Sequence, residues 1–470
     1  MLPWLAAETQ TIEKLNSAKK RFEPAHPSHY NGSRNNQLKR LFTARRDFLA
    51  VWRKVDYSER ISVSNLIGRQ VTVVNSPEHI KYVVATRHEN FERKSPQMRR
   101  ALEFLLGDGL FISDGETWKN RRPLVSDIVH KHRVPAFGDI MKNTSLELIE
   151  RWTALGEGAP VNALYEMAGL TAEIIARSVF GTDIGEESAG QVTDGFTSYQ
   201  DLIDSINIGY FLGFDEGLPA LRTPSLRRSV KRIHTIIDRV IEDHLAGKGD
   251  DNSMVELLVR RQKKNPELKL DVVALRNEAA TIFMAGHETT AATLTWAWYL
   301  LSNAPWIEEA VHAEIEAVCG SNVPTVADVP NLKMCTAVIE ETLRLYPPVP
   351  ILARQAKEAD KVGDTDVKKA SLIMIVPWLL HRTPSLFKDP DLFKPERFLE
   401  RRPTPYSYIP FAAGPRICPG LQFGLTEAIL CLAVLAQRFK LRVPKDHKVE
   451  PQCRLTLRPR GGLPVTLHRR

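Results

Sequence analysis

The stretch that decides the fold lies near the C-terminus and reads Phe411-Ala-Ala-Gly414-Pro-Arg416-Ile-Cys418-Pro-Gly420. A helix-forming apolar run follows it, so Cys418 stands at the N-terminus of a predicted helix. There the helix dipole and free backbone N–H groups favour a thiolate. Gly414 and Gly420 let the backbone approach a flat, bulky group, and Arg416 offers a cation to a nearby anion. This combination predicts ligation of a haem iron, with the arginine near the haem propionates.

The other cysteines give Cys418 its context. The chain has five cysteines in 470 residues, an odd number, and no CxxC pair. That usage argues against a disulfide framework or a zinc site and favours a reducing compartment. The alternative for any single cysteine is a small buried hydrophobe, the role that we expect for Cys319, Cys335 and Cys431. The ten-residue setting of Cys418 favours iron ligation instead.

A second chemical signature lies on the longest helix that the sequence predicts. Asp271 is a good N-cap, and helical residues continue to Asn303, before Pro305. Such a helix has about 33 residues and a length of roughly 50 Å. Its middle consists of small apolar residues, so we expect it to cross the molecule through the core.

The middle of this helix carries the sequence Ala285-Gly286-His287-Glu288-Thr289-Thr290. Thr289 lies one turn beyond Ala285 on the same face, and its hydroxyl can bond back to the carbonyl one turn earlier. Gly286 weakens the helix at this point. We therefore expect a local opening of the backbone with space for dioxygen and water, and with Glu288 beside it. The alternative is a solvent-facing acid and a threonine satisfied by its own backbone.

The rest of the chain divides into helical and β-like parts. Helical periodicity dominates residues 134–318, and an early helix is predicted over residues 35–55. Two hairpins are predicted, an early one over residues 61–74 and a final one around Gly461-Gly462. The predicted fold is mainly α with a smaller β portion, as a single domain over residues 1–470.

These motifs together resemble the cytochrome P450 family over nearly the whole chain. The pattern Phe411-x-x-Gly414-x-Arg416-x-Cys418-x-Gly420 is similar to the haem-binding loop of that family. The resemblance implies the cytochrome P450 fold, with haem b (iron protoporphyrin IX) between the long central helix and the helix that follows the cysteine loop. It implies Cys418 as the axial ligand of the haem iron.

Further residues take their roles from the same resemblance. It implies proton delivery during oxygen activation by Glu288 and Thr289. Trp118 and Arg122 match the WxxxR motif, which donates to a haem propionate; the alternative is a tryptophan packed over a surface arginine. The cofactor-binding residues that it implies are Cys418, Arg416, Trp118, Arg122, Arg354, Phe411, Gly420 and Ala285.

A structural motif completes the resemblance. Glu341-Thr-Leu-Arg344 matches the ExxR motif, and the two charged residues share a helix face. Arg397, within Pro395-Glu-Arg397-Phe, is expected to join them. A buried carboxylate between two guanidinium groups would hold the core beneath the haem loop, without a catalytic role.

The function that the resemblance implies is haem-thiolate monooxygenation. One oxygen atom of O2 is inserted into a hydrophobic organic substrate, with electrons from NAD(P)H through a separate partner. The alternatives are a haem-thiolate peroxygenase or isomerase, against which the retained Glu288-Thr289 pair argues, and a non-catalytic haem-binding sensor. Apolar residues expected in the substrate pocket are Phe104, Phe111, Ile208, Phe211, Ala285, Val349 and Ile351.

Charge and hydropathy limit the partners. Sixty-four Lys and Arg residues against 56 Asp and Glu residues give +8 without clustering, which argues against a nucleic-acid partner. No segment reaches the ~18 apolar residues of a membrane span. We expect a cytoplasmic monomer without a transmembrane anchor or a fused reductase domain.

An electron donor of the ferredoxin or flavodoxin type, with its reductase, is the expected protein partner. Basic residues flank the elements on the haem side, and an acidic donor would dock there. The alternative is a set of solvated charges matched by acids elsewhere. The expected docking residues are Lys119, Arg121, Lys131, Arg133, Lys333, Arg401 and Arg402.

Overall fold

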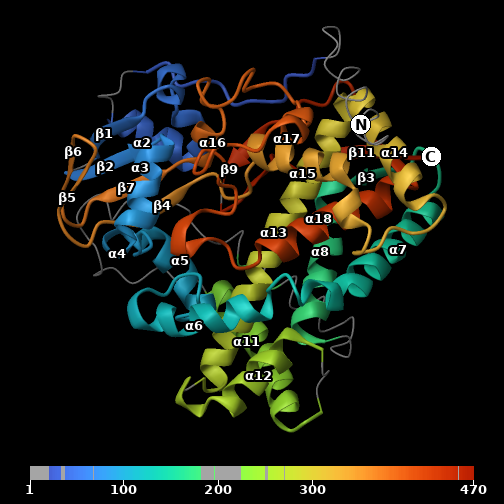
Figure 1. Cartoon of the computed structure of the whole chain (residues 1–470), viewed down its shortest axis with the longest axis horizontal. Helices are drawn as coiled ribbons and strands as arrows, with labels where there is room; N and C mark the ends of the chain where they lie inside the picture. The colour runs from blue at the N-terminus through green and yellow to red at the C-terminus, as the bar shows by residue number, and fades with distance from the viewer. Residues whose placement is uncertain are drawn as a thin grey trace, which may run out of the picture.

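The computed structural model describes residues 21–470 except for several short segments and one longer region in mid-chain. The residues outside the description are 1–20, 33–36, 67, 182–194, 196–198, 200–223, 249–251, 269 and 454. Helices fill most of the molecule, and a small sheet lies at one side of it, at the left of Figure 1. The predicted fold class, mainly α with a smaller β portion, is confirmed.

The long helix α13 (Val272–Asn303) crosses the centre of the molecule. It begins where the sequence predicts, because the Asp271 side chain accepts the N–H of Ala274 at 2.8 Å. Helix α8 (Ala163–Phe180) packs along it. Gly286 permits this contact, since a Cβ there would lie 2.7 Å from Cδ1 of Ile175. The helix is continuous, so the expected opening of its backbone is wrong; Gly286 serves close packing instead.

The main sheet has four strands in the order β1-β2-β7-β4. Strands β1 (Ile61–Leu66) and β2 (Arg69–Val74) form the predicted early hairpin. Strand β7 (Leu372–Ile375) pairs with β2 in parallel and with β4 (Leu352–Gln355) in antiparallel orientation. This arrangement brings segments from both ends of the chain into one sheet beside the site.

The predicted C-terminal hairpin around Gly461-Gly462 is wrong. Strand β10 (Leu457–Pro459) pairs with β9 (Pro451–Cys453). Strand β11 (Pro464–Arg469) pairs instead with β3 (Pro160–Asn162) and β8 (Phe439–Arg442). Gly461 and Gly462 have φ values of 74° and 91°, and these two left-handed residues turn the chain out of one sheet and into the next.

The early helix predicted over residues 35–55 is shorter, and two 3₁₀ turns follow it, Phe48–Val51 and Lys54–Tyr57. The two strands not yet named, β5 (Asp360–Val362) and β6 (Thr365–Val367), form a separate hairpin. The other helices are α2 (Gln37–Arg46), α3 (Pro77–Lys81), α4 (His88–Phe91), α5 (Pro96–Leu106), α6 (Gly115–Ile128), α7 (Gly138–Leu155), α11 (Pro224–Leu245), α12 (Met254–Lys264), α14 (Pro305–Cys319), α15 (Lys333–Leu345), α16 (Pro377–Leu380), α17 (Glu396–Glu400) and α18 (Leu421–Ala436).

Within the described ranges, no helix combines the length and the apolar character that a transmembrane span requires.

A buried carboxyl group connects α18 to α13. Glu427 is fully buried, and one of its oxygens accepts the Thr290 hydroxyl at 3.1 Å. Its other oxygen, Oε1, has no hydrogen-bond partner in the part of the chain that is described. Burial raises the pKa of Glu427 to about 8, so this carboxyl group is neutral at pH 7.

Glu427→Gln is expected to lose less stability than the parent protein as the pH rises. The folded state holds this proton up to about pH 8, whereas the unfolded state releases it near the ordinary value of 4.5. The free energy of unfolding therefore falls as pH rises between these two values, and the amide lacks this contribution. Urea midpoints at pH 5 and pH 8 measure the difference. The exposed Glu242→Gln serves as control; equal pH slopes in Glu427→Gln and the parent would contradict the assignment.

Candidate active site

The loop before α18 holds Cys418 in a defined position. The backbone N–H of Cys418 donates to the carbonyl of Phe411 at 2.9 Å, which closes the loop. Gly414 has φ 73°, and a Cβ there would collide with the carbonyl oxygen of Val84. That glycine therefore permits close packing against residues 82–86. A Cβ at Gly420 would meet only Sγ of Cys418, at 3.9 Å, so this side of the loop is open.

Cys418 differs from the other four cysteines because it is partly exposed, while they are buried. Burial raises the pKa of its thiol, against the lowering effects of the Gly420 N–H, Arg122 and Lys94. The N–H of Gly420, at the N-terminus of α18, acts to lower this pKa, but the effect of burial is larger. A metal ion bound at this thiol would supply further positive charge, because binding to a metal deprotonates a thiol.

Four cations gather near Cys418 from separate elements. Lys94 precedes α5, Arg122 lies on α6, Arg354 on β4, and Arg416 in the loop itself. A backbone bridge pairs Lys94 with Arg354. Lys94 and Arg354 are 8% and 5% exposed, so both are cations removed from water.

Electrostatic repulsion shows how closely these cations are grouped. Burial, with repulsion from Arg354 and Arg416, holds the pKa of Lys94 well below its usual range. Burial and Arg416 lower the pKa of Arg354 to about 10. The nearest acid is Glu92, whose Oε2 lies 3.7 Å from Nη2 of Arg416, and Glu92 also pairs with Lys357. The cluster thus carries more positive than negative charge.

This donor set fits haem. Among the described residues, Nε and Nη2 of Arg416 are buried without a hydrogen-bond acceptor. Buried guanidinium groups require acceptors, and the two propionates of haem supply both acceptors and negative charge. The guanidinium of Arg416 lies 4.5 Å over the ring of Trp118, which is 8% exposed. Trp118 and Arg122 follow each other by one turn of α6, so both can reach the same propionate.

The face of α13 toward the loop carries Ala285 and Thr289. Thr289 donates its hydroxyl hydrogen to the carbonyl oxygen of Ala285 at 2.6 Å, as the spacing predicts. Ala285 is exposed although most residues of α13 are buried, so this turn of the helix borders open space. Thr171 on α8 donates to the carbonyl of His287, which fixes the opposite face of the same turn.

Glu288 lies on a different side of α13 from Thr289. Its carboxylate accepts the hydroxyl hydrogen of Thr456, which lies between β9 and β10. Nη1 of Arg458, on β10, lies 3.8 Å from the same carboxylate oxygen. Glu288 thus connects α13 to the partly exposed guanidinium of Arg458.

A family comparison decides the identity of the fold. Residues 56–464 match the family described as cytochrome P450. The chain belongs to the cytochrome P450 family. Members of this family are haem-thiolate monooxygenases, and the chain is an enzyme of this class.

Individual relatives of this P450 come from bacteria, plants and mammals. Cyclooctatin synthase of Streptomyces melanosporofaciens is 34% identical over 364 residues, which cover 75% of this chain and 77% of the relative. A cytokinin hydroxylase of Arabidopsis thaliana is 31% identical over 435 residues, covering 88% and 82%. The crystal structure of the cytochrome P450DA heme domain superposes with a TM-score of 0.76 at 22% identity, covering 95% and 97%, and shows the shared fold.

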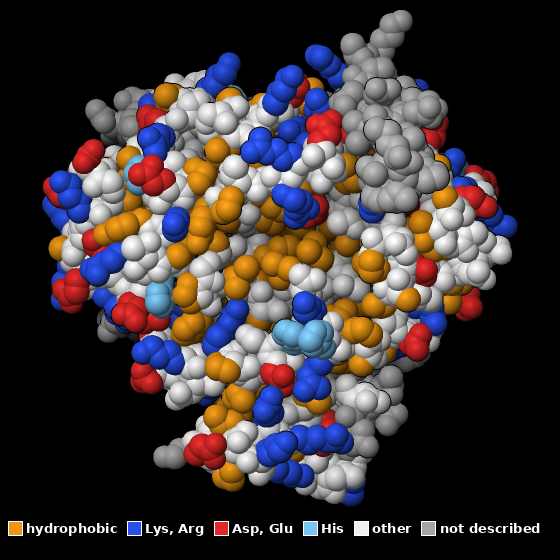
Figure 2. Space-filling view, in the orientation of Figure 1, with side chains coloured by type: hydrophobic (Ala, Val, Ile, Leu, Met, Phe, Trp, Pro, Cys, Tyr) orange, Lys and Arg blue, Asp and Glu red, His pale blue; other side chains and the backbone are white. Residues whose placement is uncertain are grey.

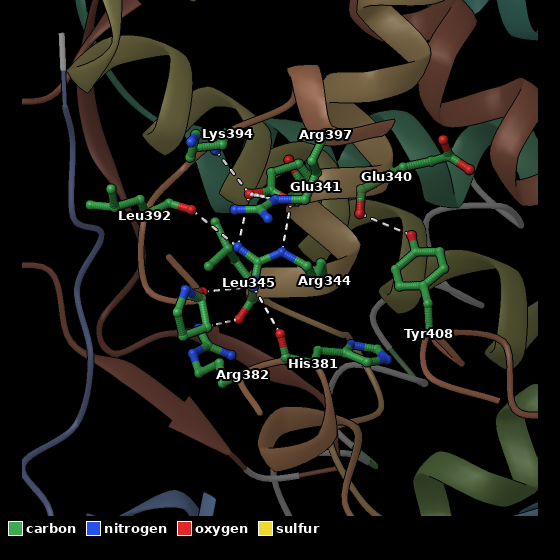
Figure 3. A network of polar contacts seen from close by, with 12 residues as sticks. Glu340, Glu341, Arg344, Leu345, His381, Arg382, Leu392, Lys394, Arg397 and Tyr408 are labelled. Atoms are coloured by element: carbon green, nitrogen blue, oxygen red, sulfur yellow. Dashed lines mark hydrogen bonds and ion pairs between the residues drawn. The ribbon is translucent and has the colours of Figure 1, made fainter. Parts of the chain in front are cut away.

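The ExxR residues of this P450 meet in the core (Figure 3). Nε and Nη2 of Arg344 donate to the two carboxylate oxygens of Glu341 at 2.7 and 2.8 Å, and both residues are fully buried. Nε of Arg397 lies 3.1 Å from Oε2 of Glu341. Arg344 also donates to the carbonyls of His381, Pro390 and Leu392. One side chain thereby fixes α15 against the segment that leads to the cysteine loop.

The residues predicted for the substrate pocket lie in three places. Phe104 and Phe111 are partly buried near the end of α5 and after it, and Val349 and Ile351 are partly buried before β4. Ala285 faces the same region from α13. Ile208 and Phe211 lie outside the described residues.

Two residues of the site were missed by sequence reasoning. Lys94 belongs to the cation cluster, and Glu92 is an acid that pairs with Arg416. The sequence Glu92-Arg-Lys94-Ser95-Pro96 reads as an ordinary charged turn before a helix. The available signal was weak: Lys94 directly precedes a strong N-cap, Ser95, and therefore has a fixed backbone position.

Proposed function

We propose that this P450 inserts one oxygen atom of O2 into a hydrophobic organic substrate, as a single domain that receives electrons from a separate partner. Haem held by a thiolate activates dioxygen when two electrons and two protons are delivered and transfers one oxygen atom to the substrate. The observation that carries the proposal is the placement of Cys418 within a buried group of cations, on a family fold whose central helix keeps Thr289 bonded back to Ala285.

The candidate residues have different proposed roles in haem binding. We propose Cys418 as the axial ligand and Arg122, Arg354, Arg416 and Trp118 as donors to the propionates, with Phe411, Gly420 and Ala285 against the haem. Lys94 joins the donors because it lies in the same buried cluster. These groups bind and orient the haem.

Proton delivery is the proposed role of Glu288 and Thr289. Arg458 is 22% exposed in its side chain, and Glu288 is 13% exposed, so protons can pass from solvent to this carboxylate. The Thr289 hydroxyl lies at the next residue of α13 and can accept and donate a hydrogen bond in turn. The proposed path runs from Glu288 to the Thr289 hydroxyl on the adjacent residue of α13, beside Ala285.

Thr289→Ala is expected to bind haem and substrate like the parent but to release more hydrogen peroxide per NAD(P)H consumed. The alanine lacks the hydroxyl that positions the proton donor, so reduced oxygen leaves before transfer to the substrate. Thr295→Ala is the matched control, since Thr295 makes the same back-bond, to Ala291 at 2.7 Å, in a fully buried part of α13. Peroxide and product are measured per NAD(P)H. Equal coupling in Thr289→Ala and the parent would remove Thr289 from the proton path.

The proposed substrate is hydrophobic and small enough for one pocket. Phe104, Phe111, Val349, Ile351 and Ala285 offer apolar surface there. Lipid, terpenoid and aromatic compounds all fit this chemistry. A panel of these three classes, screened for a ligand-induced change in the haem Soret band, selects among them.

The proposed partner is an acidic ferredoxin or flavodoxin-like protein, and its docking site is the face in Figure 2. Apolar side chains cross the middle of that face, with Lys and Arg around them. A groove of about 980 Å³ lies between the segments before α7 and α15 and the side of α18. Lys131 and Lys333 are exposed at this groove. Such a surface suits a small, electrostatically steered contact.

Four of the expected docking residues already pair with acids, among them Lys119 with Glu116 at 3.0 Å and Arg133 with Asp127 at 3.1 Å. Arg121 is only 11% exposed in its side chain and pairs with Asp108 and Glu278, so it does not belong to a docking surface. Arg402 is exposed but already pairs with Glu340 at 2.6 Å. Lys131 and Lys333 remain the strongest candidates from the sequence prediction.

Lys131→Glu with Lys333→Glu is expected to slow reduction by an acidic donor, most strongly at low salt. The reversal replaces attraction by repulsion at the groove, and salt screens both. Stopped-flow reduction at low and high ionic strength measures the effect. The control is Lys361→Glu with Lys369→Glu on the β5–β6 hairpin, at the edge of Figure 1. Peroxide-driven turnover stays unchanged in both. Identical reduction rates and salt slopes in the two double variants would place docking elsewhere.

The peroxygenase alternative, against which the Glu288-Thr289 pair argues, is tested on the same preparations. A peroxygenase forms product from hydrogen peroxide at least as fast as from O2 with NAD(P)H and donor proteins. The monooxygenase proposal expects the reverse order of rates.

A further inference from the structure

A polar network outside the cation cluster joins α13 to the segment between α5 and α6. Glu278 on α13 is 1% exposed and accepts the N–H of Leu110 at 3.1 and 3.2 Å. Nη1 of Arg121 on α6 donates to Glu278 at 3.1 Å, and the same guanidinium holds both carboxylate oxygens of Asp108 at 2.8 and 2.9 Å. Asn277 donates to Asp108 at 2.9 Å. We call these five residues the latch.

The backbone of the segment lies directly on α13 at the latch. Gly107 has φ 54°, and a Cβ there would collide with the amide of Asn277. A Cβ at Gly109 would lie 2.8 Å from the carbonyl oxygen of Asn277 and would collide with the hydroxyl of Thr281. Two glycines thus allow the close approach, and the latch supplies the polar contacts that hold it.

The segment held by the latch continues into the proposed substrate pocket. Phe111 directly follows Leu110, and Nζ of Lys94, from the cation cluster, lies 4.5 Å from the centre of its ring. On α13, Glu278 precedes Ala285 by two turns on one face of the helix. A shift of the 107–113 segment away from α13 would therefore move Phe111 relative to Ala285.

The latch contributes more to the position of residues 107–113 than to the stability of the fold. Burying a carboxylate and a guanidinium costs desolvation free energy, and apolar residues of similar size often give equal or greater stability. The pair instead fixes the geometry of the segment. Arg121 donates to one acid on α13, Glu278, and to one acid in the segment, Asp108. Glu278 also accepts the backbone N–H of Leu110, which reaches it only in the present position of the segment.

We propose that the latch fixes residues 107–113 as one wall of the substrate pocket, which makes Glu278 and Arg121 positioning residues for substrate binding. The proposal deepens the proposed function and rests on it for the location of the pocket. It predicts that weakening the latch loosens this wall without loosening the rest of the core.

Amide hydrogen exchange of the haem-loaded protein tests the first half. Glu278→Gln keeps the shape of the side chain but replaces its carboxyl group by an amide, and Asp108→Asn weakens the latch from its exposed side if Glu278→Gln folds poorly. Both are expected to raise exchange in residues 107–113 by about tenfold while the rest of α13 stays protected. The matched control is Glu308→Gln, because Glu308 is 3% exposed and forms a two-bond pair with Arg442 elsewhere in the core.

Binding of two haem ligands of different size tests the second half, with no need for turnover. Imidazole and the bulkier 4-phenylimidazole are followed by the Soret band. A loosened wall is expected to raise the dissociation rate of 4-phenylimidazole severalfold and to leave that of imidazole near the parent value. Glu308→Gln is expected to change neither rate.

The two readouts separate the possible failures. Unchanged exchange at 107–113 in both latch variants overturns the latch, and so does a rise that spreads equally over α13 or appears in Glu308→Gln. Raised exchange with unchanged 4-phenylimidazole rates overturns its role as a pocket wall. Neither result depends on oxygen transfer, so failure of the monooxygenase proposal would be seen separately, in product formation.

Discussion

Arg344→Ala should yield little haem-loaded protein. The substitution leaves Glu341 fully buried and removes the two shortest of its hydrogen bonds, 2.7 and 2.8 Å long. It also frees the carbonyls of His381, Pro390 and Leu392 from their common donor. Breaking such a buried pair costs about 3–5 kcal/mol, against about 5–15 kcal/mol for the whole stability of a typical domain.

Loss of this pair is expected to affect haem binding indirectly, by displacing the chain that leads to the loop of Cys418, because Arg344 and Glu341 do not contact that loop. Glu341 accepts the N–H of Lys394 at 2.9 Å as well as the pair from Arg344, so it holds the chain that leads to the cysteine loop. Haem content per protein and the thermal midpoint measure the effect. Arg60→Ala is the control, since its pair with Glu78 is 65% and 73% exposed and contributes little. Normal loading and stability of Arg344→Ala would show that the network is dispensable.

Cys418→Ser is expected to reduce product formation to the background level. The serine hydroxyl is a much weaker donor to iron than a thiolate, and no second cysteine is available, because Cys319, Cys335, Cys431 and Cys453 are buried. Cys431→Ser is the matched control: Cys431 accepts the Ser145 hydroxyl at 3.4 Å inside the core and lies on the same helix, α18. Activity is measured with NAD(P)H, donor proteins and a substrate from the Soret screen. Substantial product from Cys418→Ser would contradict the assignment.

Much of the fold follows from local signals in the sequence. Asp271 and Pro305 bound the long helix because capping and proline act over a few residues. The motif residues Glu341 and Arg344 lie one turn apart, so their pairing also needs only local geometry.

The features that the sequence did not predict depend instead on contacts between segments that are distant in the chain. The final strands pair with β9, β3 and β8, and two glycine residues at 461 and 462 serve equally well to end one sheet and enter another. Gly286 and Gly414 are required by Ile175 and Val84, which no local pattern connects to them. From the sequence, Arg121 is expected to be an exposed cation like its neighbours. In the structure it is largely buried because it pairs with Asp108 and Glu278.

The central claim is that Cys418 binds the haem iron as a thiolate, and one spectrum tests it most directly. The reduced parent protein with carbon monoxide should show the red-shifted Soret band of thiolate-ligated haem. Cys418→His, loaded with haem, should lose that band and show the shorter-wavelength band of an imidazole ligand, whereas Cys431→Ser should keep the parent spectrum. The same red-shifted band in Cys418→His would contradict the account, because another residue would then be the ligand.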